Sequence, residues 1–515
     1  MKIRIAFRQL AFCMIISLLV ACLSSCAYIP GLPEDVKDMF EDVTFPNVSD
    51  IFGPSAEPDT DTGVYLTEVE ENLNYTGADK QNVVIDLSGR SSQVIGKTVT
   101  IGGDVTQVVF RGKEGSVYSS LNIVVASHNN LPLTIVLENM NITGDSPRGT
   151  IFCENGRSLT IKSSGQNNSV TAANNSPAIS APNSTLQLDG NALITFLGGQ
   201  GLNGQVGNAS TGYNGSIGSI GGTALVASHV EKYGAGTVKL IGGNGGSGGD
   251  GAHGAVGNTG SYGDGSIFVT QSKPVGTAGS GTAGSNGGNG GNGGDGGLPL
   301  NPDCRVVVHE GTLHLQVGNG GKGGNGGNGG NGGVGGTGGN ADKGSWMFGA
   351  GWTYGSNGGK GGNGGNGGNG GDGGMSDAGH LSYDITVESN AHGVLQSSNY
   401  GAGGSGGNGG NGGVGGIGGS CDDTVTGKGC NYYGQACTCG GKGGNGGNGG
   451  NGGSGGNGST AGKRGAAGNG GSGGVHSTEK YTCSCEGSGS SGSNGGAGNA
   501  GKVINSGKTI EIPAN

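Results

Sequence analysis

The sequence predicts an all-β protein: a parallel β-helix into which a bundle of polyglycine-II helices is inserted. Short β-rich runs recur along the chain, long stretches hold two glycines in every three residues, and helical periodicity is absent after the first 25 residues. Glycine supplies 129 of 515 residues but proline only 13, which excludes collagen because collagen needs abundant proline.

Residues 1–25 are predicted to be a signal peptide that takes no part in the fold. Three basic residues precede an apolar segment that is too short for a stable membrane-spanning helix. Leu23-Ser24-Ser25-Cys26 resembles the lipobox of bacterial lipoproteins. The resemblance implies that Cys26 carries a fatty acyl chain such as palmitate, which would anchor the protein in a bacterial outer membrane or at the cell surface. Cys22 follows a similar tetrapeptide and is the alternative acylation site.

Residues 26–63 are predicted to form an acidic, flexible tether. From residue 27 onward this segment holds nine acidic residues and one lysine, with only short apolar clusters. Such a segment buries too little apolar surface to offset the entropy lost on ordering. Its negative charge also argues against nucleic acid as a partner.

Residues 64–241 are predicted to form the parallel β-helix. Apolar runs begin at Leu133, Leu159 and Leu186, a spacing that suits one coil of a three-faced helix better than a hairpin. The region resembles the right-handed β-helix domains of bacterial surface proteins. A β-sandwich is the alternative for these strands.

Residues 242–502 are predicted to alternate between glycine excursions and β-helix coils, the coils lying near 304–318 and 381–396. From Asn319 to Asn340 every third residue is non-glycine, which matches a polyglycine-II helix with three residues per turn. Bare glycine edges would let such helices pack closely, and the asparagine row is expected to face solvent. A flexible glycine-rich linker is the alternative.

The Gly-Gly-Asn tracts resemble those of mycobacterial PE-PGRS proteins and the polyglycine-II tips of phage tail-fibre adhesins. Strands run directly into glycine at Gly198, Gly242 and Gly318. We therefore expect successive coils to emit excursions at one corner, each running out, turning and returning. Residues 503–515 close the chain with a terminal β-run.

The turn between two tracts holds both tryptophans of the chain. We predict that Trp346, Phe348, Trp352 and Tyr354 form a binding tip, because exposed aromatic rings stack on sugars and anchor protein interfaces. The alternative is that these rings cap the end of the bundle.

Cysteines are concentrated in two other turns. Removal of the signal peptide and acylation of Cys26 leave eight thiols, an even number that suits an oxidising compartment. The candidate disulfide-forming residues, whose pairing the sequence leaves open, are Cys421, Cys430, Cys437, Cys439, Cys483 and Cys485. Cys-x-Cys pairs without Cys-x-x-Cys favour disulfides over a metal site.

The sequence shows no catalytic signature. Charges such as Asp189, Glu231, Glu310 and Asp384 stand isolated among the predicted coils, so we expect neither catalysis nor a cofactor or bound metal. The leading hypothesis is a lipid-anchored surface protein that displays loops to a glycan or to a protein on a host or other cell. Two alternatives stay open: a β-helix that binds or cleaves polysaccharide, and a purely structural surface protein.

Overall fold

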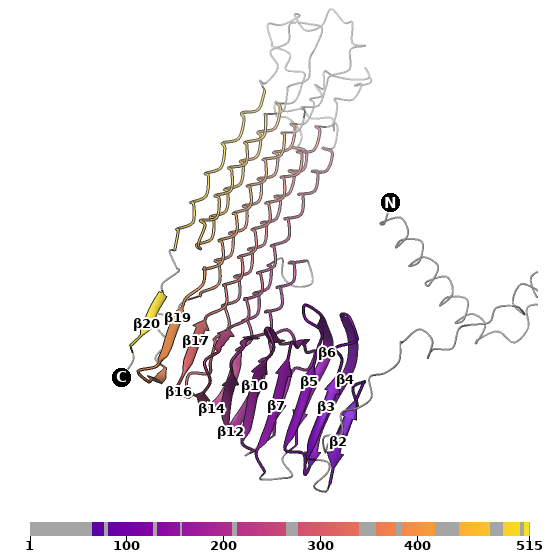
Figure 1. Ribbon diagram of the computed structural model, residues 1–515. Coiled ribbons are helices and arrows are strands. Elements are labelled where there is room, and N and C mark those ends of the chain that lie inside the picture. The colour runs from indigo at the N-terminus through magenta and orange to yellow at the C-terminus, as the bar shows by residue number, and fades with distance from the viewer. Residues whose placement is uncertain are drawn as a thin grey trace, which may run out of the picture. The chain divides into compact units, whose positions relative to one another are not determined.

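The computed structural model describes residues 64–76, 81–126, 131–154, 157–208, 214–263, 277–338, 357–376, 383–415, 417, 442–473, 488–504 and 509–513. All regular secondary structure in these segments is β, which confirms the all-β prediction (Figure 1). The strands are β1 (Val64–Leu66), β2 (Asn72–Tyr75), β3 (Asn82–Asp86), β4 (Gln93–Gly103), β5 (Gln107–Arg111), β6 (Val117–Val125), β7 (Leu133–Glu138), β8 (Asn141–Thr143), β9 (Ile151–Cys153), β10 (Leu159–Ser164), β11 (Asn167–Thr171), β12 (Ile179–Gly190), β13 (Leu193–Leu197), β14 (Leu225–Lys232), β15 (Thr237–Ile241), β16 (Arg305–Val308), β17 (Gly311–Gln316), β18 (Asp384–Val387), β19 (Ala391–Gln396) and β20 (Thr509–Ile512).

The strands stack in three ladders. The first joins β1, β3, β5, β7, β10, β12, β14, β16 and β18. The second joins β2, β4, β6, β9, β12 and β14, and the third runs from β4 through β6, β8, β11, β13, β15 and β17 to β19. Every pairing is parallel except that of β19 with β20. This mostly parallel arrangement is consistent with a β-helix-like fold.

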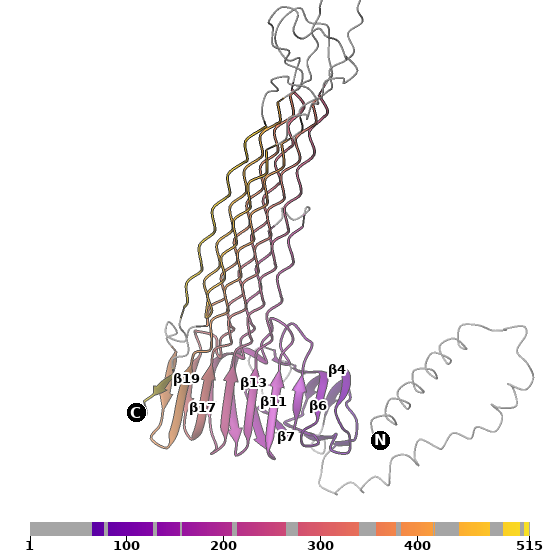
Figure 2. The ribbon, with the colours of Figure 1, turned by 90° about the horizontal axis from the view of Figure 1, so that it is seen from above.

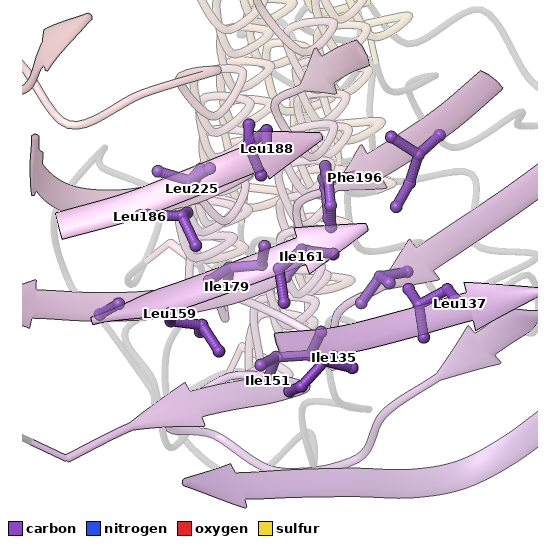
Figure 3. Packing of buried hydrophobic residues seen from close by; sticks show 14 of the residues in the cluster. Ile135, Leu137, Ile151, Leu159, Ile161, Ile179, Leu186, Leu188, Phe196 and Leu225 are labelled. Atoms are coloured by element: carbon purple, nitrogen blue, oxygen red, sulfur yellow. The ribbon is translucent and has the colours of Figure 1, made fainter. Parts of the chain in front are cut away.

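The register confirms the coil repeat predicted from the apolar runs. Leu133 pairs with Leu159, and Leu159 pairs with Leu186, so each coil returns to the same place on the first ladder. Alternate residues of each strand point inward, because successive side chains in a strand face opposite sides. The inward side chains of successive coils stack into columns of buried aliphatic residues, as Figure 3 shows for Ile135 and Ile161.

One of these columns contains a buried lysine. Lys232 pairs with Leu188 of the preceding coil and is fully buried. Its ammonium group donates hydrogen bonds to the carbonyls of Tyr233, Gly234 and Glu310, at 2.6, 2.6 and 3.1 Å. Burial lowers the pKa of Lys232, and the three carbonyls supply the polar partners that a buried ammonium needs. The aliphatic part of the Lys232 side chain therefore packs in the core, while its ammonium group lies beside the carbonyls of the turn that follows β14.

The glycine excursions leave from one corner of the ladders, as expected. Phe196, Leu240, Leu315 and Leu395 lie in register at the ends of β13, β15, β17 and β19, and a glycine-rich segment follows each strand. A first, shorter excursion occupies residues 198–222, within the range that the sequence assigned to the β-helix. Figures 1 and 2 show the excursions rising together from one edge of the sheet.

Candidate functional site

The excursions consist of glycine tracts that lie side by side. We call the tracts that lead away from the sheet outward tracts and those that lead back return tracts. In the described residues the outward tracts are 198–208, 242–263, 318–338, 399–415 and 460–473. The return tracts are 214–222, 277–297, 357–376, 442–458 and 488–502.

Backbone hydrogen bonds arrange the tracts in two layers. Each outward tract bonds to the next outward tract in parallel, as in Gly326 N–H to the carbonyl of Ser405 at 2.8 Å. Return tracts bond to one another in the same way. The layers are joined by antiparallel bonds between glycines, such as Gly327 N–H to the carbonyl of Gly288 at 2.7 Å. Each type of bond recurs every third residue, so the bonding period equals the sequence period.

Both glycines of each interior triplet are required by this packing. A Cβ atom on Gly326 would lie 2.0 Å from the carbonyl oxygen of Gly368 in the other layer. A Cβ on Gly327 would lie 1.9 Å from the carbonyl oxygen of Ala252 in the same layer. Such distances are far shorter than van der Waals contact. One glycine of the pair is therefore required by the tract in the other layer, and the second by the adjacent tract in the same layer.

The edges of the two layers need fewer glycines. The outward tract 198–208 ends early, and the tract beside it changes from glycine at 246 and 249 to Ala252 and Ala255 at the same triplet position. Hydroxyl side chains then accept backbone N–H groups across the layers. Ser285 accepts from Ala255 at 2.6 Å, and Ser219 accepts from Leu202 at 2.6 Å. Where the neighbouring tract has ended, the triplet position that would face it no longer requires glycine.

The asparagine of each triplet makes a contact that the sequence did not reveal. The side-chain Oδ1 of Asn328 accepts the N–H of Asn408 at 2.8 Å, and the N–H of Gly329 donates to the carbonyl of the same Asn408 at 2.8 Å. We call this two-bond unit the Asn-Gly clamp. The side chain is exposed as expected, but its oxygen acts as an extra backbone acceptor for the next tract in the layer.

The Asn-Gly clamp recurs throughout both layers. Aspartate can replace asparagine in it: Asp372 Oδ1 accepts the N–H of Asn457 at 2.7 Å, and Gly373 donates to the carbonyl of Asn457. Other clamps are formed by Asn286, Asn289, Asn292, Asn319, Asn325, Asn331, Asn357, Asn363, Asn366, Asn369, Asn411, Asn445, Asn448, Asn451 and Asn457. The glycine N–H groups donate to backbone carbonyls, which leaves the N–H of the non-glycine residue without a carbonyl partner. In the clamp, a side-chain oxygen of the neighbouring tract accepts this N–H.

Apolar side chains replace asparagine near the distal end of the outward layer. Val334 and Val414 occupy the asparagine position on adjacent tracts and lie in register through the bond from Gly335 N–H to the carbonyl of Val414. Tyr262 is 84% exposed and Ile417 is 47% exposed. The distal end of the described outward layer therefore carries exposed apolar side chains in place of the asparagine row.

A cluster of polar side chains lies on the outer face of β14, β16 and their following residues. Glu231 accepts a hydrogen bond from Tyr233 at 2.9 Å and lies 3.2 Å from His229. His309 stacks on the ring of Tyr233 with centroids 4.4 Å apart and lies 2.8 Å from Glu388. The bond from Tyr233 and the neighbouring His229 hold the pKa of Glu231 below its ordinary value. This carboxylate stays ionised and is a poor proton donor.

The expectation of isolated charges is wrong for three residues. Besides Glu231, Asp189 lies 3.7 Å from Lys162, and Asp384 lies 3.8 Å from Arg305. These pairs join neighbouring coils that are 27 to 79 residues apart in the sequence, so spacing along the chain could not reveal them.

The other predicted site residues lie outside the described segments: Cys26, the tip residues Trp346, Phe348, Trp352 and Tyr354, and the six candidate disulfide cysteines. Two cysteines in the described segments, Cys153 and Cys304, are buried free thiols, and burial raises the pKa of Cys304 to about 12. Neither of these two thiols belongs to the six candidate disulfide-forming cysteines. In the described segments, no group of three or more His, Cys, Asp or Glu side chains could hold a metal ion.

Comparison with known protein families, characterised proteins and solved structures finds no significant match for this chain. Within the described ranges, no helix has the length and apolar character needed to cross a membrane.

Proposed function

We propose that this protein is a lipid-anchored bacterial surface protein that displays the turns of its glycine excursions to a glycan or to a protein on another cell. The sheet serves as the base. The glycine tracts serve as a stiff projection, and the aromatic turn near Trp346 and Trp352 is the contact site.

The observation that carries the proposal is the continuous hydrogen bonding between tracts. Bonds that recur every third residue and run between tracts support a bundle of polyglycine-II helices. At a rise of about 3.1 Å per residue, the 20 residues of 319–338 would extend about 60 Å. A flexible glycine chain of that length would span only about 25 Å on average. A packed bundle thus presents its turns more than twice as far from the base.

A stiff bundle also holds its turns together. Each outward tract bonds to tracts in both layers, so the distal ends of the described tracts stay at fixed separations. Display at fixed spacing favours a partner with repeated or extended surface, because several weak contacts then act together. The lipobox ending at Cys26 supports attachment of the base to a membrane.

Adhesion to glycans and to cells tests the proposal. Purified protein lacking the signal peptide should bind a glycan array or cultured cells without releasing sugar products. Replacing Trp346 and Trp352 with alanine should remove that binding and leave the melting temperature unchanged. Normal adhesion by the double variant would refute the aromatic turn as the contact site.

The polar cluster around Glu231 favours a second function, cleavage of a polysaccharide on the face of the sheet. Carboxylates beside histidine and tyrosine are the groups that such chemistry uses. The lowered pKa of Glu231 argues against it as an acid, which leaves Glu388 for that role. Release of reducing ends that Glu388→Gln abolishes would favour cleavage over display.

A further inference from the structure

The tracts are built from Asn-Gly dipeptides, which are chemically labile. When unrestrained, the glycine amide nitrogen attacks the asparagine side-chain carbonyl carbon, Cγ. The new N–Cγ bond forms, the Cγ–Nδ2 bond breaks, and ammonia leaves with the amide proton. Water then opens the resulting succinimide ring to aspartate or isoaspartate.

The Asn-Gly clamp restrains both reacting groups. Asn448 Oδ1 accepts the N–H of Ser493 at 3.1 Å, and the N–H of Gly449 donates to the carbonyl of Ser493 at 2.8 Å. Attack requires the Gly449 nitrogen to break its hydrogen bond to the Ser493 carbonyl and turn toward Cγ of Asn448. The hydrogen bond from Ser493 N–H to Oδ1 holds that side chain against the neighbouring tract. Deamidation therefore needs local opening of two tracts.

Asn469 departs from this pattern. It lies in the outward tract 460–473, which has no further outward tract beside it in the described residues. Its side chain is exposed, and none of the described backbone N–H groups donates to its Oδ1. The N–H of Gly470 donates to a side chain, Asn494 Oδ1, at 2.8 Å, in place of a backbone carbonyl.

We propose that Asn469 is the tract asparagine at which the folded protein deamidates, and that hydrogen bonds protect the other Asn-Gly pairs of the tracts. Most of these pairs are clamped; at Asn494 the Oδ1 instead accepts the N–H of Gly470, and the following Gly495 donates to the carbonyl of Gly468. Asp250, Asp295 and Asp372 already occupy clamps and accept backbone N–H groups, so aspartate fits the geometry. Isoaspartate lengthens the backbone and shifts the three-residue phase. Confining the reaction to the last outward tract keeps such a shift out of the bundle interior.

Two tryptic peptides provide a matched comparison. Residues 443–463 contain Asn445, Asn448, Asn451 and Asn457, all clamped, and residues 465–480 contain only Asn469. Each asparagine has glycine on both sides. After incubation of the native protein in mildly alkaline buffer, mass spectrometry should show Asn469 deamidating at least about tenfold faster than any of the four. In guanidinium all five rates should agree within about twofold.

A backbone variant tests the clamp itself. Ser493→Pro removes the N–H that Asn448 accepts, whereas Ser493→Ala keeps it. In Ser493→Pro, Asn448 should deamidate about tenfold faster while Asn457 in the same peptide is unchanged. Ser493→Ala should behave as wild type.

Two results would overturn the proposal. One is a native Asn469 rate no higher than that of Asn448. The other is an unchanged Asn448 rate in a Ser493→Pro variant whose melting temperature matches that of Ser493→Ala. If Ser493→Pro does not fold, the native comparison of the two peptides still decides. Neither outcome depends on adhesion or on the lipid anchor.

Discussion

Gly327→Val is the most direct test of the packing between tracts. A Cβ at this position would lie 1.9 Å from the carbonyl oxygen of Ala252 and 2.5 Å from its carbonyl carbon. Ordinary contact would require the two outward tracts to separate by about 1.5 Å. Because the opposing atoms are backbone, no side-chain rotation can relieve the overlap.

The expected loss of stability follows from the bonds that such a separation would break. Gly251 and Gly254 each donate to the neighbouring tract at 2.7 Å, to Asn325 and Asn328. The N–H groups of the same two asparagines donate to side chains of the opposing tract, at 2.6 and 2.9 Å. At about 1 kcal/mol per bond, and with part of the strain spread along the tract, we expect a loss of about 3–5 kcal/mol.

Thermal unfolding and amide hydrogen exchange of the purified protein provide the assay. Ala255→Val is the matched control, because Ala255 is exposed at the edge of the outward layer and should tolerate valine within about 0.5 kcal/mol. Gly365→Val should resemble Gly327→Val, since its Cβ would lie 2.0 Å from the carbonyl oxygen of Ser285.

Asn328 variants separate the clamp from the glycine packing. Asn328→Ser should lose about 1 kcal/mol through its bond to Asn408, whereas Asn328→Asp should lose less because its carboxylate keeps the acceptor. Equal melting temperatures for Gly327→Val and Ala255→Val would refute the packed bundle, because a flexible linker tolerates both changes.

Three further predictions concern the anchor, the tip and the polar cluster. Cys26→Ala should abolish fatty acid labelling and release the protein from membranes; persistent labelling would indicate Cys22. Alanine at Trp346 and Trp352 should abolish adhesion without lowering the melting temperature, whereas a lower melting temperature would support the capping alternative. The lowered pKa of Glu231 contributes stability that is present above its unfolded value near 4.5 and lost as pH falls through the folded value. Glu231→Gln should therefore make the melting temperature less sensitive to pH below that value; an unchanged acid profile would contradict this assignment.

The periodic features of the sequence were sufficient to predict the class of fold. The apolar runs at Leu133, Leu159 and Leu186 gave the length of a coil, because parallel stacking brings equivalent residues of successive coils together. The four exits into glycine at one corner followed from the same repeat. These signals are local, so they can be read without knowing which segments are neighbours.

The polar contacts could not be predicted in the same way. Asn328 and Asn408 are 80 residues apart, but Asn366 and Asn451 are 85 apart, and Asn448 and Ser493 are 45 apart. These offsets depend on the lengths of the intervening turns and on which layer a tract joins. The polar cluster around Glu231 likewise forms only when β14 and β16 stack.

The sequence by itself determined the all-β class, the coil repeat and the three-residue glycine period, because each follows from the geometry of a short stretch of backbone. Only the tertiary structure decided which tracts adjoin and how asparagine is used. A Gly-Gly-Asn triplet is the same in a linker and in a bundle, but its N–H groups and side-chain oxygen gain protein partners only when a neighbouring tract lies in register. At Asn469 that neighbour is absent from the described residues, so an identical local sequence makes different contacts.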